Sequence, residues 1–273
     1  MTILVTGATG NVGRLVVDEL IGTGEQIRAL TVSPERAALP PDVEVVKGHM
    51  GKPAAVREAL AGVDRVYLAP SGETINDFLA MTAEAGVRRV VALSGSGGSE
   101  DKPSYFYSQI EDAFVGKDFD WTFLRPGAFM ANTLDWAPAI RTEGVVRAPH
   151  GDAPTAAIDL LDIATVAAKV LLEDGHVGRK YELSGPEPLT QFEQVRQIGE
   201  AIGREVKFEE LTREQALALW SEAMGVETAD FMIGVLGDAI DNPPPVVPEM
   251  DELLGRAGRT FAQWAAAHAD EFR

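Results

Sequence analysis

The chain has 273 residues, with 24 Lys and Arg against 42 Asp and Glu, so its formal net charge is −18 at pH 7. The absence of cysteine excludes disulfides, thiolate metal sites and cysteine nucleophiles. The negative surplus argues against nucleic acid and against an anionic membrane as partners, because both carry phosphate charge. No apolar run approaches the roughly 18 residues of a membrane span, and no signal-peptide pattern precedes the first predicted strand, so we expect a cytoplasmic protein.

The first half of the chain alternates short β-branched runs with helical patterns. The pattern predicts strands over residues 2–6, 26–32, 43–47, 65–69, 87–94 and 121–125, and helices over 12–22, 53–61, 74–85 and 105–115. Such an alternation is typical of a parallel sheet with helices on both faces. The run at 89–93 is almost continuously apolar, as expected for a strand that is buried on both sides.

After residue 130 the alternation becomes sparse. The sequence predicts a helix over 159–173, a strand over 179–183, and further helices over 190–202, 213–224, 229–240 and 260–272. A Pro-rich break that begins at Asn242 separates the last two helices. We therefore predict an α/β fold: a Rossmann-type, doubly wound parallel sheet in residues 1–130, completed by segments near 156–186, and a smaller, mostly helical C-terminal cap in residues 131–273.

A glycine-rich turn, TGATGNVG, joins the first predicted strand to the first predicted helix. Its three glycines have the spacing of a dinucleotide clamp, in which they allow the tight turn, the approach of backbone to pyrophosphate, and close helix–strand packing. Because a helix N-terminus supplies a positive field, this loop can hold a pyrophosphate in spite of the negative chain. The dinucleotide contacts predicted here are Gly7, Thr9, Gly10, Asn11, Val12 and Gly13.

The end of the second predicted strand bears on the choice between NADP and NAD. A carboxylate there would bind the ribose 2′-hydroxyl, whereas a nearby Arg accommodates a 2′-phosphate. The strand ends in Thr31-Val32-Ser33 without a carboxylate, and Arg36 follows in the next turn. We predict that Thr31, Ser33 and Arg36 hold a 2′-phosphate, so that NADP(H) is favoured over NAD(H). An ordinary solvated side chain is the alternative interpretation of Arg36.

Ordered motifs along nearly the whole chain resemble those of one family. They are ILVTGATGNVG, IRALTVSPERA, WTFLRPGAFMAN (121–132), AAIDLLDIATVAAKVL (156–171), KYELSGPEPLT (180–190) and GRAGRTFAQWAAAH (255–268). With this set the chain resembles the NmrA-like, atypical short-chain dehydrogenase/reductases, which include NAD(P)H-dependent quinone reductases. Further cofactor contacts are expected at or beyond later strand ends, at Met50, Ala69, Pro70, Ser94, Pro126 and Phe129.

Two positions on the adenine side differ from the pattern of this family. Relatives often carry an Arg where this chain has Val32, which weakens the prediction of NADP. After the third strand, relatives usually have an Asp near the adenine, whereas this chain reads Gly48-His49-Met50. We expect Met50 to pack on the adenine ring and His49 to stack or hydrogen-bond.

The central departure from the family pattern concerns catalysis. Short-chain reductases typically carry a Ser, a Tyr that protonates the carbonyl oxygen and, one helical turn later, a Lys that lowers the pKa of the Tyr. The resemblance places these roles at Ser94, Tyr107 and Glu111, and NmrA-like relatives commonly have an acidic residue at the third position. A carboxylate would raise the pKa of the phenol, opposite to Lys, but could accept hydrogen bonds from the nicotinamide ribose. Ser94, Tyr107 and Glu111 are the predicted catalytic residues.

A site without the Tyr–Lys pair suits a quinone or an enone, because the reduced form is a delocalised, weakly basic anion and needs no strong proton donor. The leading prediction is NAD(P)H-dependent hydride transfer to such a conjugated carbonyl. Two alternatives stay open. One is ketoreduction of a bulky natural-product-like substrate with Tyr107 as the proton donor, and the other is a catalytically silent NAD(P) sensor.

The substrate is predicted to contact Ser96, Tyr105, Phe129 and Met130. By resemblance, the loop at 125–130 runs beside the nicotinamide, although packing in a core is the alternative role for Tyr105, Phe129 and Met130. The four histidines lack metal-ligand spacing, so no metal is predicted. The expected partner is a small-molecule substrate, and a homo-oligomer or a regulatory protein partner stays open.

Overall fold

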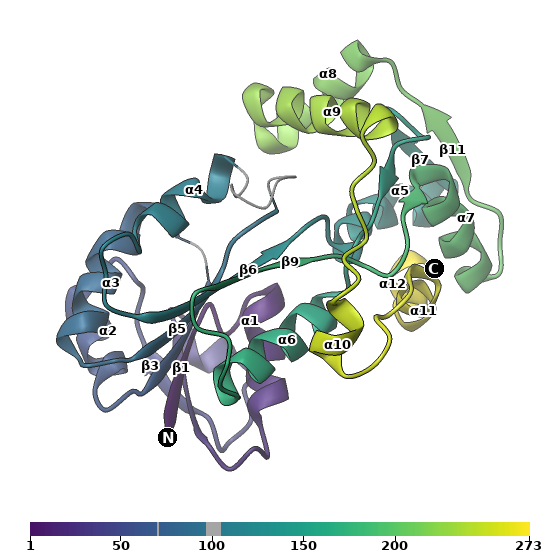
Figure 1. Cartoon of the computed structure of the whole chain (residues 1–273). Coiled ribbons are helices and arrows are strands. Elements are labelled where there is room, and N and C mark those ends of the chain that lie inside the picture. Colours follow the sequence, from purple (N-terminus) through teal and green to yellow (C-terminus); the bar gives the residue numbers. More distant parts are fainter. Residues whose placement is uncertain (70, 97–104) are drawn as a thin grey trace. The chain divides into compact units, whose positions relative to one another are not determined.

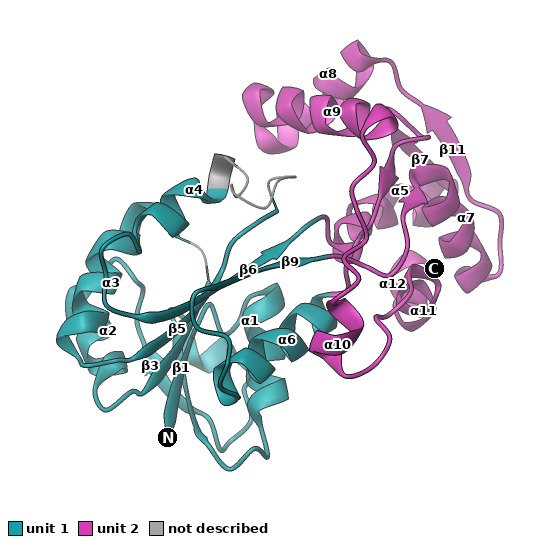
Figure 2. Ribbon diagram, viewed as in Figure 1, with its two compact units in different colours: residues 1–127, 160–183 teal, residues 128–159, 184–273 magenta. Residues whose placement is uncertain are grey.

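Two compact units make up the computed structural model of the chain, which describes residues 1–69, 71–96 and 105–273, the first two residues of the last range by their backbone alone. Unit 1 comprises Met1–Gly127 and Leu160–Leu183, and unit 2 comprises Ala128–Asp159 and Ser184–Arg273 (Figure 2). Each unit is therefore built from two separate stretches of the chain.

A seven-stranded parallel sheet forms the centre of unit 1. The strand order is β3-β2-β1-β4-β5-β6-β9, and every neighbouring pair is parallel. The strands are β1 (Thr2–Thr6), β2 (Gln26–Thr31), β3 (Glu44–Lys47), β4 (Arg65–Leu68), β5 (Arg89–Leu93), β6 (Asp120–Pro126) and β9 (Arg179–Leu183). This sheet confirms the predicted Rossmann-type, doubly wound fold.

Helices cover both faces of this sheet (Figure 1). They are α1 (Asn11–Leu20), α2 (Pro53–Leu60), α3 (Ile75–Glu84), α4 (Tyr105–Asp112) and α6 (Leu160–Leu172). On one face, Val56 of α2, Phe78 of α3 and Ile110 of α4 share a core with strand residues such as Leu4 and Val66. On the other face, α1 packs on β1 and β2 and against α6, which packs on β4, β5 and β6.

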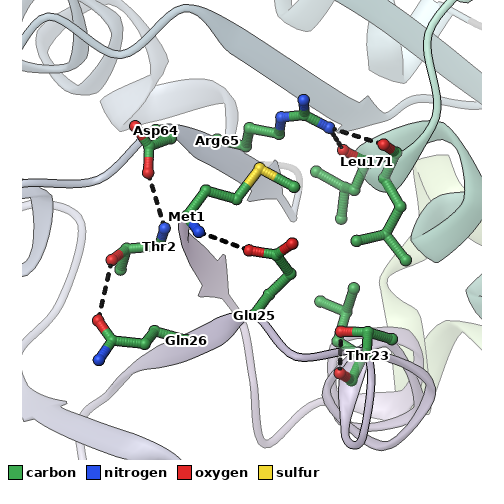
Figure 3. Close-up of polar contacts among 10 residues, drawn as sticks. Met1, Thr2, Thr23, Glu25, Gln26, Asp64, Arg65 and Leu171 are labelled. Carbon is green, nitrogen blue, oxygen red and sulfur yellow. Dashed lines mark hydrogen bonds and ion pairs between the residues drawn. The ribbon is translucent and has the colours of Figure 1, made fainter.

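At the amino ends of the strands, two arginines bind the C-terminal end of α6. Arg65, at the start of β4, donates hydrogen bonds to the carbonyl oxygens of Leu171 and Leu172 (Figure 3). Arg89, at the start of β5, donates to the Glu173 carbonyl oxygen at 2.5 Å and pairs with Asp174 at 2.6 Å. These contacts satisfy carbonyl groups that the end of a helix leaves without an intrahelical partner.

Unit 2 is mainly helical. Its helices are the 3₁₀ helix η3 (Met130–Trp136) and the α-helices α5 (Ala137–Glu143), α7 (Gln191–Ile202), α8 (Arg213–Met224), α9 (Val226–Asp241), α10 (Met250–Leu254), α11 (Phe261–Ala267) and α12 (Ala269–Phe272). Three of them begin with a capping box, at Thr190, Thr212 and Thr260. A separate core surrounds Trp264, Phe261 and Ile198. No helix in the described part of the chain is long and apolar enough to cross a membrane.

Two short sheets in unit 2 were not predicted. Strand β7 (Val145–Ala148) pairs in parallel with β11 (Lys207–Glu210), and β8 (Pro154–Thr155) pairs antiparallel with β10 (Leu189–Thr190). The helix predicted over 260–272 is also divided, because His268 leaves helical geometry, with φ −106 and ψ 17, and separates α11 from α12.

Candidate active site

The glycine-rich loop lies between β1 and α1, and two of its glycines, Gly7 and Gly13, leave no room for a side chain. Gly7 has a left-handed φ of +60, and a Cβ there would lie 2.7 Å from the Cβ of Ala69. A Cβ on Gly13 would lie 2.2 Å from the Gly7 carbonyl oxygen, which accepts the Gly10 N–H at 2.9 Å. Gly10 is the N-cap residue of α1 and has no capping side chain, so the first amides of the helix can donate to an anion. This geometry fits a dinucleotide pyrophosphate.

The carboxyl ends of β1 and β4 are tied together beside this loop. The Thr6 hydroxyl donates to the Tyr67 carbonyl oxygen at 3.2 Å and accepts the Ala69 N–H at 2.8 Å. The strand order reverses between these two strands, and ligands of open α/β sheets bind at such a point. Ala69 therefore lies where the sequence predicts a cofactor contact, whereas Pro70 lies outside the described residues.

Several predicted cofactor residues meet at the tip of β2. The hydroxyl oxygens of Thr9 and Thr31 are 3.5 Å apart, and the Thr31 hydroxyl accepts the Ser33 N–H at 3.3 Å. Arg36 is exposed at the end of a 3₁₀ turn, η1 (Pro34–Arg36). Arg14, which sequence reasoning missed, donates to the carbonyl oxygens of Ala37 and Ala38 at 3.3 and 3.0 Å, and so holds the loop that follows Arg36. Its position directly after the third glycine was the available signal.

Three other predicted cofactor residues have different surroundings. Asn11 is exposed at the start of α1, while Val12 is 6% exposed and faces the core. Met50 is 9% exposed and packs in the core of unit 1. The described geometry therefore gives Val12 and Met50 a packing role, and their contact with a cofactor stays a prediction.

Glu111 is the centre of a buried ion-pair cluster. Arg125, fully buried on β6, donates from Nε and Nη2 to the two Glu111 oxygens, each at 2.7 Å. The Ser94 hydroxyl donates to Glu111 Oε1 at 2.8 Å, and Lys180 Nζ lies 3.6 Å from Oε2. Burial by itself raises the pKa of Glu111, but the hydrogen bonds from Arg125 and Ser94 and the neighbouring positive charges outweigh it and lower the pKa. Glu111 is therefore a carboxylate, and its oxygens already accept hydrogen bonds from the protein.

The sequence did not lead us to predict Arg125 as the partner of Glu111. Arg125 also donates from Nη1 to Glu182 Oε1 on β9 at 3.1 Å, and its contacts with Glu111 raise its pKa. The available signal was an Arg within the otherwise apolar run WTFLRP, because a buried Arg needs a carboxylate partner.

Tyr107 lies against the backbone that follows β5. A Cβ built on Gly95 would lie 2.3 and 2.4 Å from Cδ2 and Cε2 of the Tyr107 ring, so the ring occupies the space beside this glycine. Ser94 is only 1% exposed. Tyr67 is fully buried, and its hydroxyl has no partner among the described residues; burial, with a smaller effect of Tyr107, raises its pKa and keeps the phenol neutral.

The predicted substrate residues belong to both units. In unit 1, the Ser96 N–H donates to the carbonyl oxygen of Pro126 at 3.0 Å, and Tyr105 begins α4 with its side chain outside the described residues. In unit 2, Phe129 is half-buried and pairs its backbone with Ile158. Met130 is 1% exposed in the core of unit 2, which is the packing alternative that the sequence left open.

Comparisons with known proteins agree with this geometry. The model of a family described as NAD(P)H-binding matches residues 7–174. The chain is 42% identical to a (4-alkanoyl-5-oxo-2,5-dihydrofuran-3-yl)methyl phosphate reductase of Streptomyces griseus and 32% identical to an NAD(P)H azoreductase of Xenophilus azovorans, in each case over 99% of both chains. It also resembles the NADPH complex of an NADPH-dependent quinone oxidoreductase from Escherichia coli, with a TM-score of 0.84 and 25% identity over 98% of this chain and 99% of the other. The chain belongs to the family described as NAD(P)H-binding and is an NAD(P)H-dependent oxidoreductase, and its solved neighbours, a quinone oxidoreductase and NmrA among them, have the fold of the NmrA-like, atypical short-chain dehydrogenase/reductases that the motifs indicate.

Proposed function

We propose that this reductase transfers hydride to a double bond conjugated with a carbonyl group, in an enone or a quinone. The observation that carries the proposal is the ion pair of Glu111 with Arg125. One turn after Tyr107, the helix carries a carboxylate that is already paired, so Tyr107 has no Lys beside it on α4. The hydroxyl proton of Ser94 is donated to the same carboxylate and is not offered to a substrate oxygen.

An acceptor whose reduced form is a delocalised anion does not need a proton from Tyr107 or Ser94. When bound, NADPH supplies a hydride. Addition of hydride to the β-carbon of an enone breaks the C=C π bond and leaves an enolate, which takes a proton from water. A simple ketone would instead give a localised alkoxide, which requires a strong proton donor at the oxygen. The work of these residues is then mainly to bind and orient the acceptor.

The named relatives support this class of acceptor. The ring double bond in the substrate name of the Streptomyces griseus reductase is conjugated with both the ring carbonyl and the alkanoyl carbonyl. The Xenophilus azovorans and Escherichia coli relatives are named for azo and quinone reduction. All three names describe acceptors in which the added electrons are delocalised or stay on electronegative atoms.

We further propose NADPH as the preferred donor. At the tip of β2 the hydroxyls of Thr9 and Thr31 lie 3.5 Å apart, Thr31-Val32-Ser33 contains no carboxylate, and Arg36 is exposed in the turn that follows. A 2′-phosphate would be favoured by these donors and by the guanidinium, whereas a free 2′-hydroxyl has no carboxylate to bind. Arg36→Ala is expected to lower the ratio of kcat/KM for NADPH to that for NADH about tenfold, the effect of losing one charged hydrogen bond.

The test is a panel of enones, quinones and plain ketones, with NADPH oxidation followed by absorbance. We expect turnover of enones or quinones and transfer of deuterium from C4-labelled NADPH to the β-carbon of the enone. Tyr107→Phe should retain this turnover, and Tyr181→Phe, which removes the phenol that contacts His176 at 2.7 Å, is the matched control. Turnover of ketones alone, lost in Tyr107→Phe, would replace the proposal by ketoreduction. NADPH binding without turnover of any acceptor would contradict both.

A further inference from the structure

We propose that Arg125 is a positioning residue for hydride transfer, which acts through Glu111 by holding α4 against β6. This inference rests on the proposed function, because its kinetic test measures the reduction of an acceptor. The residue does not contact the reacting atoms in the proposal. Through Glu111, Arg125 fixes helix α4, which carries Tyr107, and it also fixes the hydroxyl of Ser94 at the end of β5. These contacts keep the shape of the site beside the carboxyl ends of β5 and β6.

The contacts of the pair are bidentate and buried. Arg125 donates to both oxygens of Glu111 at 2.7 Å, with 0% and 7% of the two side chains exposed. A planar guanidinium that meets both oxygens of a carboxylate fixes direction as well as distance. Glu182 on the neighbouring strand accepts another guanidinium N–H, so Arg125 is itself held in orientation.

Helix α4 depends on such an anchor because it is short. It has eight residues, which is too few for a helix to be stable alone in water. Ile110 places one side chain in the core of unit 1, and Glu111 makes the polar contact beside it. Tyr107 lies one turn earlier on the same side of the helix, with its ring against Gly95. A shift of Glu111 would therefore move the Tyr107 ring.

The same carboxylate orients Ser94. The only hydroxyl proton of Ser94 is donated to Glu111 Oε1, and its backbone N–H is donated to the Leu124 carbonyl oxygen at 2.7 Å. Ser94 can therefore only accept a hydrogen bond from a ligand. Loss of the carboxylate would free this proton and change the polarity that Ser94 offers to the site.

A merely stabilising role can be separated from a positioning role. Replacing a buried ion pair by apolar side chains of similar size is often neutral for stability, whereas removing one partner is not. The double variant Glu111→Leu/Arg125→Met should therefore fold, while it lacks the directional anchor. Arg125→Lys keeps the charge without the bidentate geometry.

The readouts are the melting temperature, the Kd for NADPH, kcat and KM for the best acceptor, and hydrogen exchange of the α4 amides. We expect the double variant to melt within about 5 °C of the wild type. Its kcat should fall about tenfold to a hundredfold, the loss expected when reacting groups are slightly misplaced. The Kd for NADPH should change less, and the amides of α4 should exchange faster. Arg125→Lys should show the same loss of kcat. The matched control is Arg89→Met, which breaks an Arg–carboxylate pair at the opposite end of β5 and should lower stability but not kcat.

A double variant with wild-type kcat and wild-type exchange in α4 would overturn the inference. If the double variant does not fold, Arg125→Lys decides, because a folded variant with unchanged kcat is incompatible with positioning. If the wild-type chain reduces no acceptor, the proposed function fails by itself. Exchange of α4 in the variants still tests the anchor in that case, since it needs no substrate.

Discussion

Gly13 is the position at which the dinucleotide loop tolerates a side chain least. Its added Cβ would meet the Gly7 carbonyl oxygen at 2.2 Å, closer than the 3.2 Å for Gly10, so the backbone of the loop must move. We expect Gly13→Ala to weaken NADPH binding at least about tenfold and to lower the free energy of unfolding by about 1–3 kcal/mol, as overpacking does. Titration of NADPH fluorescence and thermal melting measure the two effects.

Gly234 provides the matched control for that substitution. It lies on the exposed side of α9, and an added Cβ would meet no atom within 4 Å. Gly234→Ala should leave NADPH binding unchanged and raise stability by up to about 1 kcal/mol, because Ala is the better helix former. Equal loss of NADPH binding in both variants would mean that the loop geometry is not what holds the dinucleotide.

The candidate site was only partly predictable from the sequence, and Glu111 shows why. The departure from Lys at this position is visible in the linear order, because Tyr107 lies one turn earlier on the same predicted helix. The Arg in WTFLRP indicates that some carboxylate pairs with it, but the sequence does not say which one, because α4 and β6 have no shared periodicity and meet only in the folded sheet. From the sequence we expected the Glu111 carboxylate to accept hydrogen bonds from the nicotinamide ribose. In the structure its two oxygens accept hydrogen bonds from Arg125 and Ser94.

At the scale of elements, the connection between α6 and β9 contains a histidine that resists protonation. His176 Nδ1 lies 2.7 Å from the Tyr181 hydroxyl, and Nε2 is buried without a partner among the described residues. Burial lowers the pKa of His176, against a smaller opposing effect of Glu173. The charged groups that interact with the imidazole include Glu173, Lys169, Arg89 and Arg179, and Asp174 interacts with it as well.

This lowered pKa predicts how stability depends on pH. The folded chain binds fewer protons at His176 than the unfolded chain, whose histidine has a pKa of about 6.5. The stabilising contribution is therefore present above about pH 6.5 and is lost as the pH falls towards the lowered folded value. As the pH is lowered from about 8 to 5, the melting temperature should fall less steeply for His176→Asn than for the wild type. His49→Asn, which removes an exposed imidazole, is the control, and identical slopes in all three proteins would contradict the prediction.

The elements themselves differed in how well the sequence predicted them. The six strands of the first half and β9 were predicted within two residues. The central strands β1, β4 and β5 are buried and read as nearly continuous apolar runs. The edge strands β3 and β9 are largely exposed, and they were recognised from their place in the alternation of strands and helices. Strands β8 and β10 have two residues each, too few to show a period of two. Strands β7 and β11 pair across a long separation, and only the tertiary fold brings them together.

At the scale of the whole molecule, the net charge of −18 opposes the folded state. Like charges repel in the compact state, and dissolved salt screens this repulsion. We expect the melting temperature to rise by a few degrees between about 0.05 and 0.5 M sodium chloride, which corresponds to about 1 kcal/mol for a chain of this size. A fall over this range would mean that attraction within ion pairs such as Arg147–Glu209 outweighs the repulsion.

The buried pair of Arg125 and Glu111 also has an evolutionary consequence. Glu111→Lys alone would place a third cation beside the buried Arg125 guanidinium and the Lys180 ammonium, and such an uncompensated buried charge is strongly destabilising. Both positions have to change together. A chain of this fold therefore acquires Lys at position 111 only together with a compensating change at Arg125.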